Sequence, residues 1–213
     1  MSVSLSSLTS RLQSDIPVLN GVPTSDQLAD AARDAAYDFS RRASLKRITT
    51  LSIVAGTATY ALPADFLKVV RLPALSNPSG VFLSGGQLVP IDPTFRERWT
   101  VAGQRITFVP TPLYTLDREL TYAAAHVLDE DDAYADMTEE VAAIVLLKAR
   151  AILQRLLVRE ATKSAVKRYE QGAVTVELDT DTQIKGLDKS AAADEQQYAA
   201  AVARYVGTIT MQG

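Results

Sequence analysis

The sequence contains no cysteine and only one histidine, His126. The absence of cysteine excludes disulfide bonds, thiolate metal sites and thiol chemistry, and it is typical of a protein assembled in a reducing compartment. A metal site or an acid–base pair at His126 would need a second imidazole or a thiol, and neither exists in the chain. We therefore interpret His126 as a histidine at the rim of a strand rather than as a base or a ligand.

The sequence also lacks the motifs of nucleotide-binding enzymes and hydrolases. It has no Walker loop, no glycine fingerprint for dinucleotides and no Gly-x-Ser-x-Gly. The segment LSGGQ, Leu83 to Gln87, matches a transporter ATPase signature, but that signature has a meaning only beside a Walker loop. We predict a protein that is not an enzyme, with no catalytic residues and no cofactor.

Neither an excess of positive charge nor a long apolar run is present. The net charge of -3 gives no basic field over the whole molecule, so any DNA contact must be local. The most apolar window, residues 141–158, is interrupted by Lys148, Arg150, Gln154 and Arg155, so we predict no membrane span. The first residues, MSVSLSSLTSRLQSD, have no basic segment followed by an apolar one, and we expect no signal peptide.

The composition is that of a folded chain. Apolar residues make up 47% of the 213 residues, which is enough for a core, and the chain can hold one domain with an inserted module. One acidic cluster stands out and comprises Asp129, Glu130, Asp131 and Asp132. It lacks the alternating ligands and the glycine of a calcium loop. We interpret it as a solvated loop near a helix N-terminus and predict no metal site.

The N-terminal part predicts two helices. Leu5, Leu8 and Leu12 share one face of a short helix that ends near Asp15. After the turn at residues 20–23, Thr24 and Gln27 have the spacing of a capping box. The inward stripe of this second helix should consist of Leu28, Ala32, Ala35 and Phe39.

From Leu45 the apolar pattern has the period of a β-strand. Residues 45–53 and 59–62 predict a hairpin around Ala55-Gly56, and residues 68–72 predict a third strand. Residues 104–109 and 118–127 predict two more. Residues 73–87 are rich in Gly, Ser and Pro and predict a mobile loop or a loose hairpin.

A long helix should follow, with Asp136 as its N-cap and Glu139 at the third position, and it should run to about Tyr169. Its polar residues lie on two opposed edges, so its apolar surface is split into two faces. Such a helix is either the central rod of a bundle or packs against a neighbouring subunit as well. The residues that we expect at a subunit interface are Leu146, Ile152, Leu153, Leu156 and Leu157.

The same helix carries a basic stripe, which consists of Arg155, Arg159, Lys163 and Lys167. The stripe could face a phosphate backbone, or it could be a solvated face with Glu160 and Glu170 as partners. After a polar stretch at residues 172–189, partly strand-like, a last helix is expected over residues 190–206, with Gly207 at its end. That helix is either a docking arm or an ordinary closing helix.

The segment TYALPADFLKVVRL, residues 59–72, carries the clearest resemblance to a known family. Pro63 should end a strand, Asp65 should cap the turn that follows, and Phe66 should fold back as an apolar plug. The pattern Tyr-x-Leu-Pro-x-Asp-Phe before a valine-rich strand resembles the head–tail adaptor (connector) proteins of tailed bacteriophages. ITFVPTP at residues 106–112 and the strand, acidic loop and long helix of residues 120–153 continue the resemblance.

The resemblance implies a structural virion protein that forms a ring, usually a dodecamer, beneath the portal of the filled head. It implies an extended DNA channel, for which the basic stripe supplies the candidates, and a platform for tail or nozzle proteins. The portal-docking candidates are Tyr198, Val202, Tyr205 and Ile209. The competing hypotheses are a DNA-binding or DNA-packaging accessory protein that uses the basic stripe and, with less support, a metal-dependent hydrolase.

We thus expect an α+β fold that is mainly helical, with one long central helix and an inserted antiparallel β-module. The expected division is residues 1–44 for the N-terminal helices, 45–128 for the β-module, 129–171 for the central helix and 172–213 for a linker and C-terminal helix.

Overall fold

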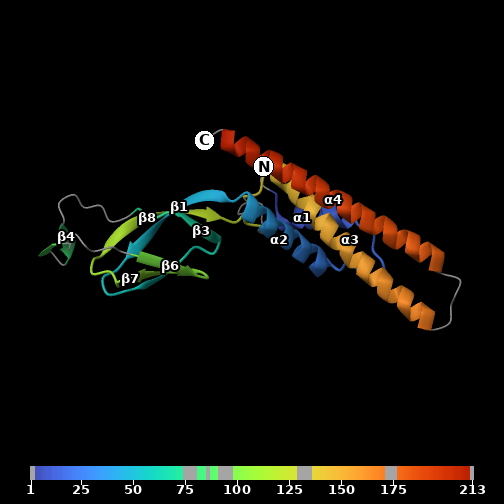
Figure 1. Ribbon diagram of the computed structural model, residues 1–213, viewed down its shortest axis with the longest axis horizontal. Coiled ribbons are helices and arrows are strands. Elements are labelled where there is room, and N and C mark those ends of the chain that lie inside the picture. The colour runs from blue at the N-terminus through green and yellow to red at the C-terminus, as the bar shows by residue number, and fades with distance from the viewer. Residues whose placement is uncertain are drawn as a thin grey trace. The chain divides into compact units, whose positions relative to one another are not determined.

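The computed structural model describes residues 3–73, 81–84, 87–90, 98–128, 136–170 and 177–211. The chain forms two compact units, which are shown in Figure 1. One unit comprises Met1–Ala43 and His126–Gly213 and holds the helices; the other comprises Ser44–Ala125 and holds the strands. The β-unit is therefore inserted in sequence between the two parts of the helical unit.

Both N-terminal helices agree with their predictions. Helix α1 spans Leu5–Asp15 and buries its three leucines. Helix α2 spans Ser25–Arg42, and Thr24 and Gln27 form the expected capping box, with Gln27 N donating to Thr24 Oγ1 at 3.3 Å and Thr24 N donating to Gln27 Oε1 at 2.8 Å. The predicted stripe of Leu28, Ala32, Ala35 and Phe39 is buried. These elements follow from local sequence alone.

The long helix α3 spans Glu139–Glu170, close to its predicted extent, but its predicted cap is wrong. The Val141 amide donates to Thr138 Oγ1 at 3.4 Å, so Thr138 stands at the helix start. Asp136 instead accepts a hydrogen bond from the Val127 amide at 2.8 Å. The Asp136 carboxylate thus holds the backbone at Val127, shortly after the end of the β-unit's last strand.

A second long helix, α4, spans Glu177–Met211 and corrects the C-terminal prediction. The polar residues from Asp179 to Lys189 are helical instead of forming a linker, and the helix continues past Gly207. Helices α3 and α4 run side by side (Figure 1). The bundle therefore has two long helices, where the sequence indicated one.

Helix α3 packs against the three other helices of the chain. Leu153 and Leu157 are buried in a core that α1 and α2 also build, and Tyr198 and Val202 of α4 belong to the same cluster. Within one chain α3 packs against other helices of the bundle, and its contact with a neighbouring subunit stays a prediction. A second face of α3 is thus covered by α4.

The β-unit contains eight strands in the described part of the chain. They are β1 (Leu45–Ile53), β2 (Thr59–Ala61), β3 (Phe66–Arg71), β4 (Val81–Ser84), β5 (Gln87–Pro90), β6 (Arg98–Ala102), β7 (Arg105–Val109) and β8 (Leu116–Ala124). All described pairings are antiparallel, in the orders β1-β8-β3, β2-β7-β6 and β4-β5.

The predicted hairpin of residues 45–62 is wrong. Strand β1 pairs along its whole length with β8, from Leu45 opposite Ala124 to Ile53 opposite Leu116, whereas β2 pairs with β7. The chain leaves one sheet at the Ala55-Gly56 turn and enters another. Both three-stranded sheets contribute to one apolar core, with Ile53 and Leu120 from the first and Ile106 and Phe108 from the second.

Strands β4 and β5 pair antiparallel, which agrees with the loose hairpin that the sequence allowed as one alternative. Residues 74–80 and 85–86 of that predicted loop lie outside the described part of the chain. The α+β class is confirmed, with helices and antiparallel strands in separate units. In the residues described, no helix is both long enough and apolar enough to span a membrane.

Candidate interaction surface

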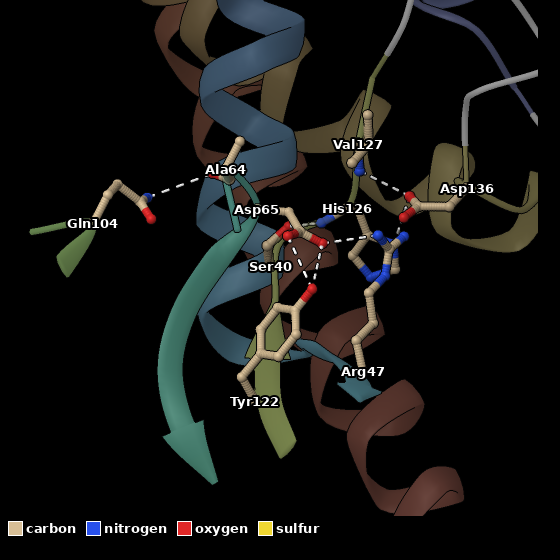
Figure 2. Close-up of polar contacts among 9 residues, drawn as sticks. All are labelled: Ser40, Arg47, Ala64, Asp65, Gln104, Tyr122, His126, Val127 and Asp136. Atoms are coloured by element: carbon tan, nitrogen blue, oxygen red, sulfur yellow. Dashed lines mark hydrogen bonds and ion pairs between the residues drawn. The ribbon is translucent and has the colours of Figure 1, made fainter. Parts of the chain in front are cut away.

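The motif that carried the resemblance forms the corner between the two sheets of the β-unit. Asp65 is its polar centre, as Figure 2 shows. Its carboxylate accepts hydrogen bonds from Arg47 Nη1 at 2.8 Å and from the Tyr122 hydroxyl at 3.1 Å, and its carbonyl accepts one from the Ala125 amide at 2.7 Å. Asp65 therefore joins β1, β8 and the corner, instead of capping the turn as predicted.

The other motif residues are structural as well. The Phe66 amide donates to the Pro63 carbonyl at 3.0 Å, which closes the turn, and the Phe66 side chain is buried as the predicted plug. The Tyr60 hydroxyl accepts from the Val54 amide at 2.9 Å and lies 2.7 Å from the Thr57 carbonyl. The motif thus specifies a folded corner and offers no catalytic group.

His126 is buried and is not at a solvent-exposed rim. Its backbone amide donates to Ser40 Oγ at 2.9 Å (Figure 2). Its Nε2 lies 3.2 Å from the Ala43 carbonyl. A carbonyl can only accept, so Nε2 carries a proton. The ring packs on Phe39, with centroids 5.3 Å apart. His126 therefore ties the returning chain to the end of α2.

The predicted portal-docking residues lie mostly inside the bundle. Tyr198 and Val202 are buried in the helical core, and the Tyr198 hydroxyl donates to Asp38 Oδ2 at 2.8 Å. Burial, and then the hydrogen bond to Asp38, raise the Tyr198 pKa well above its usual range. Tyr205 packs on Phe39, and the side chain of Ile209 lies outside the described residues. The last helix is thus a closing helix of the bundle.

The predicted interface leucines separate into two groups. Leu153 and Leu157 are fully buried in the chain's own core and are not available to a partner. Leu146 and Ile152 are partly buried against that core. Leu156 is partly exposed, and it lines a groove together with Ile152.

This groove lies between α2 and α3 and has a volume of about 350 Å³. Its floor is apolar and includes Ala31, Ile152 and Leu156. The α2 side contributes Asp30 and Asp34, and the α3 side contributes Arg155 and Arg159, so the two walls have opposite charges. An apolar floor between charged walls suits a helix that carries small residues flanked by charges of both signs.

Two of the four residues of the basic stripe form ion pairs within the chain. Arg155 forms an ion pair with Glu195 of α4, and Lys163 lies 3.6 Å from Glu160. Arg159 is exposed at the groove, and the side chain of Lys167 lies outside the described residues. The solvated-face interpretation therefore fits Arg155 and Lys163 better than a phosphate-binding face does.

Arg155 belongs to a polar ladder that the sequence analysis missed. Lys148 bonds Glu195 at 3.1 Å, Arg150 bonds Asp194 at 3.0 Å, and Gln154 bonds Ser190 at 3.0 Å. The partners all lie on α4, in the first half of the predicted last helix. The sequence did contain one indication of these contacts, because Asp194 and Glu195 have the opposite charge to Arg150 and Arg155.

Comparison with known proteins assigns the family. A family model described as SU10 adaptor protein matches residues 3–212, nearly the whole chain. The chain belongs to this family. A comparison with curated proteins gives no match. The match confirms the resemblance to phage head–tail adaptors, and it extends over the C-terminal residues that the motif resemblance did not reach.

Membership in the SU10 adaptor family makes the chain a structural component of a phage particle that contacts other structural proteins. Within the described residues, no group of three or more His, Asp and Glu side chains is placed to hold a metal ion. The acidic cluster Asp129–Asp132 lies outside those residues. The surfaces that remain for an adaptor's contacts include the groove and the exposed face of α4.

Proposed function

We propose that this adaptor forms a ring, a dodecamer as in the head–tail adaptors it resembles, beneath the portal of the filled head. The ring extends the DNA channel and provides the platform on which tail or nozzle proteins assemble. Genomic DNA passes through it without sequence-specific binding. The protein is made in the cytoplasm of the bacterial host and functions in the virion at the head–tail interface.

The observation that carries the proposal is the family match over residues 3–212. The groove between α2 and α3 supports it, because its partly exposed Ile152 and Leu156 and its charged walls are suited to a protein partner. The DNA-binding alternative has less support, since Arg155 and Lys163 are engaged by Glu195 and Glu160.

Deletion of the gene from the phage tests the proposal. An adaptor that acts after packaging should leave heads that are filled with DNA but carry no tails, and purified protein should restore tail attachment in vitro. Empty heads would instead support the packaging alternative. Tailed, infectious particles from the deletion strain would contradict both functions.

A further inference from the structure

None of the residues that the structure describes fills the groove between α2 and α3, and its two walls differ in charge. Asp30 and Asp34 line it on α2, and Arg159 lines it on α3. We propose that it receives the outer face of α4 from a second copy of this chain. The inference rests on the ring proposed above and assigns the contact that joins neighbouring subunits.

Contacts between side chains fix the relative direction of the helices within one copy. Lys148 bonds Glu195 whereas Gln154, further along α3, bonds Ser190, so α4 is antiparallel to α3. Helix α2 is antiparallel to α3 as well. Its residues 27–34 lie beside residues 152–159 of α3. Further along α2, Asp38 contacts Tyr198, which packs on Lys148, an earlier residue of α3. Helices α2 and α4 are therefore parallel.

This arrangement sets the level of each residue along the bundle. Asp38 and Tyr198 lie at the same height along the bundle, because the Tyr198 hydroxyl donates a hydrogen bond to Asp38 at 2.8 Å. Eight residues back, or about 12 Å along each parallel helix, Asp30 is level with Ser190. In a ring whose axis runs along the helices, neighbouring copies stand at the same height. Lys189 of one copy therefore arrives at the level of Asp30 in the next.

The outer face of α4 is complementary to the groove at that level. Asp188, Lys189 and Ala192 are all exposed. Successive helical residues are about 100° apart, so Asp188 and Lys189 flank Ala192 on the helix surface. A copy of α4 that turns Lys189 towards Asp30 turns Asp188 towards the Arg159 wall. Ala192 then faces the floor at Ile152, and its small side chain permits close helix approach.

The two surfaces also have the relation that a ring requires. The groove is formed by α2 and α3, whereas the face that enters it belongs to α4. A contact between different surfaces of identical subunits is heterologous, and it closes into a ring when the rotation between subunits allows closure. Each subunit has this groove and this face of α4. In a closed ring the groove of every subunit is therefore filled by α4 of its neighbour.

Disulfide cross-linking tests the contact directly, because the natural chain has no cysteine. Ile152→Cys combined with Ala192→Cys should give, under mild oxidation of the assembled protein, a ladder of covalent oligomers that reductant removes. The matched control combines Ala192→Cys with Ala143→Cys, since Ala143 is an exposed alanine of α3 that does not line the groove. A ladder of equal strength from the control, or monomers alone from the Ile152 pair, overturns the inference.

A charge exchange gives an independent test. The Lys189→Glu variant should need at least a tenfold higher protein concentration than the wild type to assemble on filled heads that lack the adaptor. Light scattering measures this assembly. Adding Asp30→Lys to that variant should restore most of the loss. If Lys189→Glu assembles like the wild type while the wild type restores tails, the contact is wrong and the proposed function stands. If the wild type neither binds heads nor restores tails, the proposed function itself fails.

Discussion

The Tyr122 hydroxyl donates to the Asp65 carboxylate at 3.1 Å and joins the central strand β8 to the corner after β2. Arg47 of β1 bonds the same carboxylate. One acidic residue of the family-like motif thus holds three parts of the β-unit. Burial, followed by the charge of Asp65, raises the pKa of Tyr122, so the neutral phenol persists as the donor.

We expect Asp65→Ala to lower the free energy of unfolding of the β-unit by about 2–3 kcal/mol, because the Tyr122 hydroxyl and Arg47 lose their acceptor. Tyr122→Phe should cost about 1 kcal/mol. In a double-mutant cycle the two changes should couple by about 1 kcal/mol. Fluorescence of Trp99, the one tryptophan of the chain, reports unfolding of the β-unit in urea. Purely additive effects would show that the hydroxyl and the carboxylate act separately.

Two neighbouring leucines of α3 should respond differently to the same change. Leu157 is fully buried, so Leu157→Asp should destabilise the helical unit by more than about 4 kcal/mol. Leu156 lines the groove and is partly exposed, so Leu156→Asp should leave a folded monomer that no longer assembles. Far-UV circular dichroism measures folding, and light scattering measures assembly. Normal assembly of the Leu156 variant would remove the groove from the interface.

Truncation after Lys189 should destabilise the helical unit. The deleted segment contains Tyr198 and Val202 of the core and Asp194 and Glu195 of the polar ladder. Its removal exposes one apolar face of α3 to water, so we expect loss of the cooperative thermal transition in far-UV circular dichroism. An unchanged melting temperature would mean that α4 is a separable arm. The matched variant Tyr198→Phe keeps the core and should remain folded.

The stability of the helical unit should depend on pH through Tyr198. Its pKa is raised in the folded state above the ordinary tyrosine value of 10.0, chiefly by burial, so the neutral phenol stabilises the fold. That contribution is fully present below pH 10 and is lost as the pH rises towards the higher folded pKa.

Tyr198→Phe should therefore cost about 1–2 kcal/mol at neutral pH, and its deficit relative to wild type should shrink above about pH 10. Urea unfolding at several pH values measures it. Tyr37→Phe, at a tyrosine that is 56% exposed, is the control and should show little effect. A deficit that widens with pH would reverse the assignment.

Local patterns predicted the elements whose determinants are close in sequence. The leucine spacing of α1 and the capping box at Thr24 and Gln27 each lie within a few turns of chain, and both were found. Strand pairing was not predictable in the same way. Leu45 pairs with Ala124 across the whole inserted unit, and the alternation of a strand does not reveal its partner. The adjacent hairpin was the simpler choice and was wrong.

The start of α4 and strand β6 show the same limit. The residues from Asp179 to Lys189 look like a polar linker, yet they form helix, and Leu187 within them packs against the core. Tertiary packing overrides a weak local preference there. Strand β6 was missed, although Trp99 and Val101 alternate before the turn at Gly103, whose φ of 57° suits glycine. The groove could not be derived without knowing which helices are neighbours.

The central claim is that this chain is a head–tail adaptor, and a cryo-electron microscopy reconstruction of the tail-bearing vertex of the virion tests it most directly. We expect a ring of subunits with this fold between the portal and the tail, with α4 of each subunit in the α2–α3 groove of the next. A vertex in which the portal contacts the tail without this protein, or a virion from which it is absent, would contradict the account.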